Sequence, residues 1–245
     1  MPGAKTAAER SRETTPRRRR GTRRRPPPPT VVLLVRHGTT ETTGKELPGR
    51  ASGLHLAESG REQAEAVAQR IAALIETSAD GRKAPRGRIA AVYSSPLERT
   101  RETAAPIAKA AGCEVTIDDA LVELDIGEWT GLALEAAHKR PEWATIQRYP
   151  SGFTFPGGES FVDMQARMVA CLDRLRAAHA GETIVAVSHA DPIRAVVAHA
   201  MGTHLDLFQR LAISPCSVTA IAYGDGGPLV LTVNATGDGR ALVPS

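Results

Sequence analysis

The sequence predicts an α/β protein, a three-layer α/β/α sandwich with a mainly parallel open sheet and helices on both faces. Short apolar runs rich in β-branched residues alternate with longer segments whose apolar residues recur every three to four positions. Two of the runs, 31–35 and 183–187, are almost entirely apolar, as expected of strands buried on both faces. A chain of 245 residues is long enough for one sizeable domain of this kind.

Six such runs are the expected strands. The first, Val-Val-Leu-Leu-Val, is bounded by Pro29 and Gly38, and the third is the weakest. In chain order the six runs are 31–35, 89–93, 115–117, 183–187, 218–223 and 229–233.

Four helices are expected between the strands. The first begins near Ser59, which stands in capping-box spacing with Glu62. Segment 95–98, Ser-Pro-Leu-Glu, predicts the second helix, with serine as the N-cap, proline in the first position and glutamate in the third. Gly112 is expected to end that helix.

The last two helices follow a long irregular region. Ser160, with Asp163 three residues later, predicts a helix that Gly181 ends. Asp191-Pro192 opens another helix, which closes near Gly202. Helices and strands therefore alternate through most of the chain, which supports the predicted fold.

The sequence divides into a tail, residues 1–29, and a domain, residues 30–245. The tail contains an arginine run and then four prolines, with little apolar material to bury, so we expect it to be disordered. Residues 1–30 hold ten Lys or Arg against two acids, whereas residues 31–245 hold 21 basic and 25 acidic residues. The overall charge of +4 therefore comes from the tail. We expect no role in nucleic-acid binding, with binding through Arg17–Arg25 as the alternative.

The remaining composition predicts a cytoplasmic protein without a membrane segment, metal or cofactor. No apolar run reaches the roughly 18 residues that a spanning helix needs, and the tail lacks the apolar region of a secretory signal. The cysteines, Cys113, Cys171 and Cys216, are far apart and lack metal-ligand spacing. Cys216 has no neighbouring basic residue that would make it a nucleophile.

Two histidines follow the two most apolar runs. His37 is the second residue after 31–35, and His189 is the second residue after 183–187. Ligands of open α/β sheets bind at the carboxyl ends of the strands. A neutral imidazole can attack phosphorus with one ring nitrogen while the other is held as N–H. Arginine suits the phosphate oxygens; Arg36 adjoins His37, and Arg99 lies in the first turns of the second helix.

Four sequence blocks in this order resemble the histidine phosphatase superfamily, in its phosphoglycerate mutase-like branch. They are Arg-His-Gly at 36–38, Ser-Ser-Pro-Leu-Glu-Arg-Thr at 94–100, Glu-Leu-Asp-Ile-Gly-Glu-Trp-Thr-Gly at 123–131, and Ser-His at 188–189. The first block alone is common, but four blocks in family order are specific. The family includes cofactor-dependent phosphoglycerate mutases and small phosphatases.

The resemblance implies a role for each matching residue. His37 would be the nucleophile that forms a phosphohistidine, and Glu123 the acid that protonates the leaving oxygen and then helps to activate water. Such an acid needs a pKa raised by burial. The implied phosphate pocket consists of Arg36, Arg99 and His189.

Other positions are less certain matches to the family pattern. Thr43 occupies a slot that usually holds asparagine, and its hydroxyl could still donate to phosphate. Arg50, in a glycine-bounded loop, either binds other groups of the substrate or is a solvated charge. Asp125 is the alternative acid. Segment 157–160 resembles a family segment that closes over the site. The same Gly-Gly-Glu-Ser sequence is also typical of a glycine turn that leads to a serine N-cap.

The sequence favours a phosphatase over a mutase. True mutases of the family carry, after the matching acid, an Arg-His-Tyr run and a lysine, where this chain has Leu124, Asp125, Ile126 and later Leu134. We therefore expect a histidine acid phosphatase-like phosphomonoesterase that hydrolyses a small phosphorylated metabolite through a phosphohistidine. A phosphomutase is the alternative. A non-catalytic phospholigand sensor, a nucleic-acid binder and a metal-dependent phosphatase have less support, because all five site residues are present and no Asp-rich cluster is.

Overall fold

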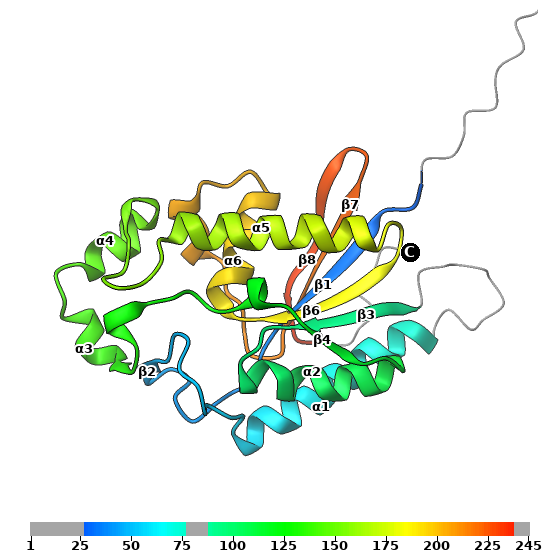
Figure 1. The fold of residues 1–245 in the computed structure, drawn as a ribbon, viewed down its shortest axis with the longest axis horizontal. Coiled ribbons are helices and arrows are strands. Elements are labelled where there is room, and N and C mark those ends of the chain that lie inside the picture. Colours follow the sequence, from blue (N-terminus) through cyan, green and yellow to red (C-terminus); the bar gives the residue numbers. More distant parts are fainter. Residues whose placement is uncertain (1–26, 77–87, 238–245) are drawn as a thin grey trace, which may run out of the picture.

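A mixed six-stranded sheet forms the centre of the molecule, and its strand order is β4-β3-β6-β1-β7-β8 (Figure 1). The computed structural model describes residues 27–76 and 88–237. Strands β4, β3, β6 and β1 are parallel, and β7 runs antiparallel to both β1 and β8. All six predicted strands are confirmed: β1 (Thr30–Arg36), β3 (Ile89–Ser94), β4 (Val115–Ile117), β6 (Thr183–Ser188), β7 (Val218–Gly224) and β8 (Gly227–Ala235). Most of the predicted tail, residues 1–26, lies outside the described residues.

Strands β1 and β6 are neighbours in the middle of the sheet. Their parallel register pairs Val31 with Thr183 and Arg36 with Ser188. The N–H of His37 then donates to the carbonyl of Ser188 across 3.0 Å. The residues after the two strands, His37 and His189, therefore lie side by side at the carboxyl edge of the sheet.

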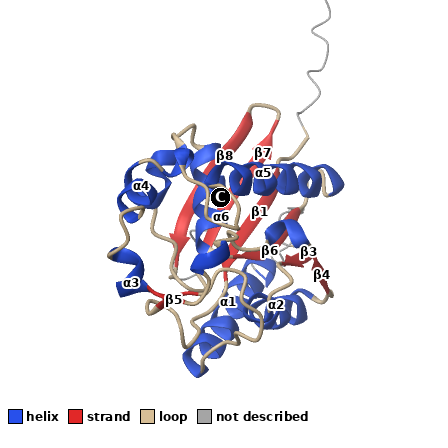
Figure 2. Ribbon diagram, turned by 60° about the vertical axis from the view of Figure 1, so that its left-hand side comes forward, coloured by secondary structure: helices blue, strands red, loops and turns tan. Residues whose placement is uncertain are grey.

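Two pairs of helices cover the two faces of the sheet, which confirms the three-layer sandwich (Figures 1 and 2). Helices α1 (Glu58–Glu76) and α2 (Glu98–Ala111) cover one face, and α5 (Phe161–Ala178) and α6 (Ala190–Ala200) cover the other. Successive residues of a strand point to opposite faces, so Leu33 joins the core under α1 and α2 while Leu34 joins the core under α5 and α6.

The helix ends agree with the sequence signals at Gly112 and Ser160 but not at Ser59 or Ser95. Helix α1 begins at Glu58, so Ser59, where its start was expected, lies within its first turn. Gly112 ends α2 in the left-handed conformation, and the Ser160 hydroxyl accepts a hydrogen bond from the N–H of Asp163. Ser95 was predicted to be the N-cap of α2, but that helix begins at Glu98 with Leu97 as its N-cap. The reason is that Ser95 continues the sheet, with its N–H donating to the Val187 carbonyl at 3.0 Å, while its side chain bonds elsewhere.

The region between β4 and α5 contains more regular structure than its sequence predicted. It includes helices α3 (Leu134–His138) and α4 (Trp143–Arg148), and strand β5 (Leu132–Ala133), which pairs with β2 (Glu46–Leu47). This part of the chain lies beyond the carboxyl ends of the parallel strands (Figure 1). It has its own aromatic core, in which Trp129 contacts Phe155. Short 3-10 helices occur at Asp119–Leu121, Gly127–Trp129, Pro150–Gly152 and Leu205–Arg210.

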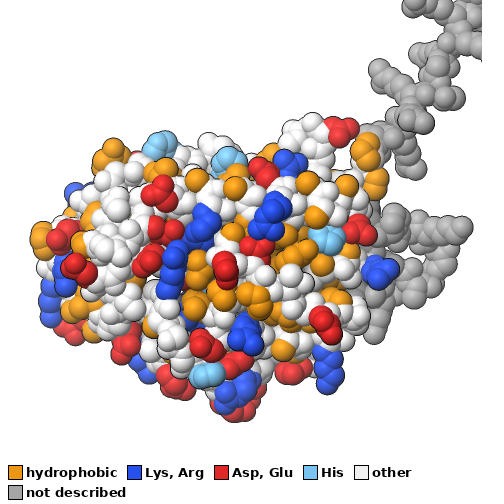
Figure 3. All heavy atoms as spheres, in the orientation of Figure 1, with side chains coloured by type: hydrophobic (Ala, Val, Ile, Leu, Met, Phe, Trp, Pro, Cys, Tyr) orange, Lys and Arg blue, Asp and Glu red, His pale blue; other side chains and the backbone are white. Residues whose placement is uncertain are grey.

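The surface of the folded part carries mixed charge. Acidic and basic side chains are interspersed over the face shown in Figure 3, with hydrophobic side chains scattered between them. Across 27–76 and 88–237, none of the helices combines the length and apolarity needed to traverse a lipid bilayer.

Candidate active site

The two predicted histidines meet at the edge of the sheet. Their ring centroids are 5.1 Å apart in an edge-to-face arrangement. His189 is completely buried, and His37 is only 6% exposed. The adjacent parallel strands β1 and β6 thus bring together side chains that lie about 150 residues apart in the sequence.

The His37 ring is held in one tautomer. Its Nδ1 lies 2.7 Å from the carbonyl oxygen of the next residue, Gly38. A carbonyl only accepts hydrogen bonds, so Nδ1 carries the proton and Nε2 keeps its lone pair. Burial, followed by the charges of Arg99 and Arg36, lowers the pKa of His37 to about 3. The ring is therefore neutral at ordinary pH, which a nucleophile requires.

His189 bonds Ser95 with one ring nitrogen and faces Glu123 with the other. Its Nε2 lies 2.9 Å from the hydroxyl of Ser95. Its Nδ1 is buried without a hydrogen-bond partner and lies 3.9 Å from a carboxylate oxygen of Glu123. Burial and then the neighbouring His37, Arg99 and Arg36 hold the pKa of His189 well below its ordinary value. This ring is neutral as well.

Two arginines supply positive charge beside the histidines: Arg99 is fully buried and Arg36 is partly buried. Arg36 donates from Nη1 to the carbonyl of Ile213 at 2.7 Å, and Arg99 donates from Nη2 to the carbonyl of Gly49 at 2.8 Å. These bonds orient the guanidinium groups. The Nε of Arg36 and both Nε and Nη1 of Arg99 are buried and have no partner among the described residues. Buried unpaired N–H groups are costly, and a phosphate oxygen is the acceptor that suits them best.

Glu123 has the protonation behaviour of a general acid. One carboxylate oxygen, Oε1, accepts the N–H of Leu124 at 2.9 Å. Burial, and then the charge of Asp191, raises the pKa of Glu123 to about 7, against the opposing effect of the Leu124 N–H and the arginines. The other oxygen faces His189. Glu123 can therefore give and take a proton near neutral pH.

Arg50 lies behind Glu123 and holds its backbone. The Nε of Arg50 donates to the Glu123 carbonyl at 2.8 Å, and its Nη2 bonds to Glu159 at 2.8 Å. Arg167 of α5 donates to the carbonyls of Ala120 and Val122 at 2.7 and 3.0 Å, and bonds the same Glu159 oxygen at 2.6 Å. Arg50 thus bonds the backbone of the acid and the side chain of Glu159, and its contact with a substrate stays a prediction.

The other two positions named by the sequence are engaged locally. The Thr43 hydroxyl accepts the N–H of Thr40 at 2.9 Å and bonds the Thr40 hydroxyl at 3.0 Å. Asp125 uses one oxygen to accept the N–H of Gly127 at 3.0 Å and the other to contact Arg50 at 3.4 Å. Of the two candidate acids, only Glu123 has a carboxylate oxygen next to the histidines.

Several supporting residues carried no clear sequence signal. Thr103 of α2 accepts the N–H of Gly38 at 3.1 Å, and a side chain at Gly38 would place its Cβ 2.5 Å from the carbonyl oxygen of Gly60. Glu159 and Arg167 were also missed, although Glu159 belongs to segment 157–160, which the sequence singled out. Their signal is long-range pairing, which no single sequence contains.

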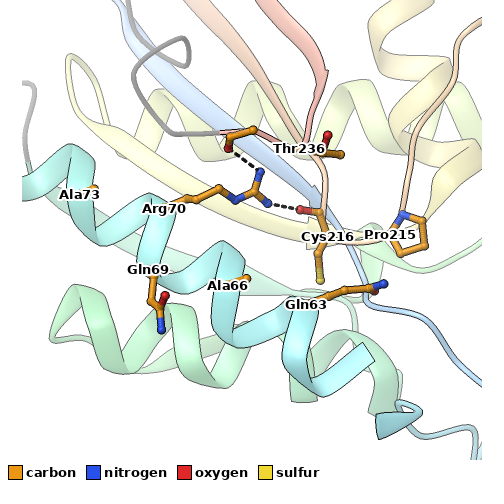
Figure 4. Close-up of a pocket in the computed structure, with 9 residues that line it drawn as sticks. Gln63, Ala66, Gln69, Arg70, Ala73, Pro215, Cys216 and Thr236 are labelled. Atoms are coloured by element: carbon orange, nitrogen blue, oxygen red, sulfur yellow. Dashed lines mark hydrogen bonds between the residues drawn. The ribbon is translucent and has the colours of Figure 1, made fainter. Parts of the chain in front are cut away.

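A separate cavity of about 630 Å³ lies between α1 and the turn before β7 (Figure 4). Arg70 crosses it and donates to the Cys216 carbonyl at 2.6 Å, while the Cys216 N–H donates to the Arg36 carbonyl at 3.0 Å. Burial raises the pKa of the Cys216 thiol to about 12. This region therefore anchors the end of β1 and holds no reactive thiolate.

Within residues 27–76 and 88–237, no group of three or more His, Cys, Asp or Glu side chains is arranged to hold a metal ion.

Comparison with known proteins identifies a family. A family model described as "Histidine phosphatase superfamily (branch 1)" matches residues 32–236. A bifunctional protein of Mycobacterium tuberculosis is 37% identical over 205 residues, which are 83% of this chain and 53% of that protein. The chain thus spans about half the length of this relative.

Two further relatives match over most of both chains. Phosphoserine phosphatase 1 of Hydrogenobacter thermophilus is 32% identical over 82% of this chain and 90% of its own length. A probable phosphoglycerate mutase of Photorhabdus laumondii is 30% identical over 77% and 83%. Among solved structures, a mycobacterial glucosyl-3-phosphoglycerate phosphatase superposes with a TM-score of 0.72, at 24% identity over 84% of this chain and 99% of that one. This last likeness concerns the fold.

Proposed function

The chain belongs to the histidine phosphatase superfamily (branch 1), and from this premise we propose that it hydrolyses phosphomonoesters of a small phosphorylated metabolite through a phosphohistidine. The domain responsible would span residues 30–245, which include the matched segment 32–236. The observation that carries the proposal is the bare Nε2 of His37, which lies beside unpaired arginine N–H groups and an acid whose pKa is about 7.

In the first step, Nε2 of His37 attacks phosphorus and the bond to the ester oxygen breaks. The proton of Glu123 goes to that oxygen, so the product leaves as a neutral alcohol and Glu123 becomes a carboxylate. Arg36 and Arg99 donate to the phosphoryl oxygens and offset the charge that these oxygens carry in the transition state.

In the second step, Glu123 takes a proton from water. The water oxygen attacks the phosphohistidine, the P–N bond breaks, and its electron pair returns to Nε2. Inorganic phosphate leaves, and both His37 and Glu123 are restored to their starting protonation states. No cofactor enters either step.

The test is turnover of p-nitrophenyl phosphate in chelator by wild type and His37→Ala. We expect the variant to lose activity by about 10³-fold or more, and wild type treated with labelled substrate and quenched in alkali to carry acid-labile phosphate. His138→Ala is the matched control, because His138 is exposed on α3. Undiminished activity of His37→Ala would refute the mechanism, and loss of wild-type activity in chelator would indicate a metal instead.

A phosphomutase is the second candidate, which similarity to a probable phosphoglycerate mutase favours. Such an enzyme returns the phosphoryl group to a second hydroxyl, so it must retain a doubly phosphorylated intermediate. Leu124, Asp125 and Ile126 provide no positive charge after the acid, and Arg50 and Arg167 are already bonded to backbone carbonyls. We therefore expect bisphosphoglycerate to yield phosphate faster than it phosphorylates an acceptor, which a coupled mutase assay measures.

A further inference from the structure

Ser95 and His189 form a completely buried pair beside the proposed phosphate site. Both side chains have no exposed surface, and the Ser95 oxygen lies 2.9 Å from Nε2 of His189. The helix signal at residues 95–98 had assigned this serine to capping α2. Its hydroxyl instead points to the second histidine, a contact that the two proposed chemical steps leave unexplained.

The tautomer of His189 follows from counting protons around the Ser95 oxygen. A neutral imidazole has one N–H and one lone pair, and His189 is neutral. The Ser95 oxygen also receives the N–H of Leu97, at a long 3.5 Å. If Nε2 carried the proton, that N–H would point at the same oxygen, and the hydroxyl proton would have no acceptor within the part of the chain described. A buried donor without an acceptor is destabilising.

The opposite assignment pairs every group around the Ser95 oxygen and leaves one open donor, the Nδ1–H of His189, on the Glu123 side of the ring. The N–H of Leu97 donates to the Ser95 oxygen, the Ser95 hydroxyl donates to Nε2 of His189, and Nδ1 of His189 carries the proton. Nδ1 is buried, has no partner and lies on the Glu123 side of the ring. An arriving phosphoryl oxygen would provide the missing acceptor.

We propose that Ser95 is a positioning residue that fixes His189 as the Nδ1–H tautomer, so that this histidine donates a hydrogen bond to the phosphoryl group. His37 also carries its proton on Nδ1, but the Gly38 carbonyl holds that N–H away from the site. The lone pair on Nε2 of His37 therefore faces the site. One histidine then attacks phosphorus while the other stabilises the oxygens. The catalytic part of this inference rests on the proposed phosphatase function.

The first test is the tautomer itself, measured by nitrogen-15 NMR of the full-length protein labelled at histidine. Protonated and bare ring nitrogens resonate separately, and comparison with the His189→Asn spectrum assigns the His189 signals. We expect Nδ1–H in wild type and a shift toward Nε2–H in Ser95→Ala. An Nε2–H tautomer in wild type would overturn the proposal, whether or not the protein proves to be a phosphatase.

The second test is kinetic. Ser95→Ala is expected to lose about 10²-fold in kcat and to bind inorganic phosphate more weakly as a competitive inhibitor. Ser94→Ala is the matched control, since Ser94 is equally buried but its hydroxyl donates to the Ser95 carbonyl at 2.9 Å and not to a histidine. Ser95→Cys preserves the shape with a weaker donor and is expected to lie between wild type and Ser95→Ala in both readouts.

The outcomes separate the two hypotheses. Wild-type turnover combined with unchanged kcat, phosphate inhibition and tautomer in Ser95→Ala would refute the role of Ser95 alone. A wild type that hydrolyses no phosphomonoester would refute the proposed function, while the NMR result would still decide whether Ser95 sets the tautomer. If Ser95→Ala does not fold, the same comparison is made with Ser95→Cys.

Discussion

At the scale of single residues, the site depends on environments that shift pKa values in opposite directions. Burial disfavours the charged form of any group, so it lowers the pKa of His37 and raises that of Glu123. The arginines add to the first effect and oppose the second. The result is a bare nucleophile and a protonated acid over the same pH range, which the first proposed step needs.

The pH dependence of kcat/KM follows from these two groups. His37 is neutral above about pH 3 and Glu123 is protonated below about pH 7, so we expect kcat/KM to decline as the pH rises through 7. Glu123→Gln cannot donate a proton, so it should remove this decline and lower kcat by about 10²–10⁴-fold. The loss should be larger for glycerol phosphate than for p-nitrophenyl phosphate, whose leaving group needs little protonation. Equal losses on both substrates would contradict the acid role.

Glu123 also makes stability depend on pH. Its folded pKa of about 7 exceeds the ordinary value of 4.5, so the folded state binds the extra proton and loses stability as the pH rises from about 4.5 to 7. Glu123→Gln avoids this loss and should be more stable than wild type at pH 8, by at most about 3 kcal/mol, and similar to it at pH 4. Urea unfolding at both pH values measures the difference.

At the scale of elements, the backbone around Glu123 is held by an ion-pair network of Arg50, Glu159 and Arg167, which come from separate segments. Arg50 comes from the loop before α1, Arg167 from α5, and Glu159 from the turn before α5. One oxygen of Glu159 accepts both arginines and the Asp125 N–H. The three side chains are between 18% and 33% exposed, so water weakens this network less than it weakens a surface ion pair.

The variant Glu159→Gln tests this ion-pair network. It keeps an acceptor oxygen but removes a negative charge, so both arginines should loosen from the backbone around Glu123. We expect kcat to fall about tenfold and the decline of kcat/KM to move to lower pH, because removing a negative charge lowers the pKa of the acid. Glu135→Gln is the control, since Glu135 forms an exposed pair with Lys139 on α3. An unshifted pH profile would show that the ion-pair network does not influence the pKa of Glu123.

At the scale of the whole molecule, charge is unevenly distributed along the sequence. The residues 31–245 are mildly acidic, whereas residues 1–30 are strongly basic. Within residues 27–76 and 88–237, the side chains of His37, Arg99, Glu123 and His189 hydrogen-bond to Gly38, Gly49, Leu124 and Ser95, all of which lie in the folded part.

Deletion of residues 1–26 is therefore expected to leave kcat/KM unchanged for p-nitrophenyl phosphate. It should also abolish any binding of single- or double-stranded DNA that falls steeply with salt concentration. Fluorescence anisotropy at low and high salt measures the second effect for the full chain and the deletion variant. Salt-dependent DNA binding that persists in the deletion variant would locate it on the folded surface.

The sequence by itself determined the six strands of the central sheet, the four helices that cover it and the end of α2 at Gly112. It also named the five central site residues, whose chemical roles stay predictions. It could do so because apolar periodicity, glycine stops and the short blocks around His37, Arg99, Glu123 and His189 are local in the chain. The strand endings of β1 and β6 also predicted the meeting of the two histidines, since neighbouring parallel strands end at one edge.

Only the tertiary structure decided what Ser95 and Arg50 do. Ser95 has the local signal of a helix cap, yet it bonds a histidine 94 residues away. Arg50 looked like a substrate contact or a solvated charge, yet it holds the carbonyl of a residue 73 positions away. A polar side chain bonds whichever partner the packed chain brings within about 3 Å, and that distance is set by the fold as a whole.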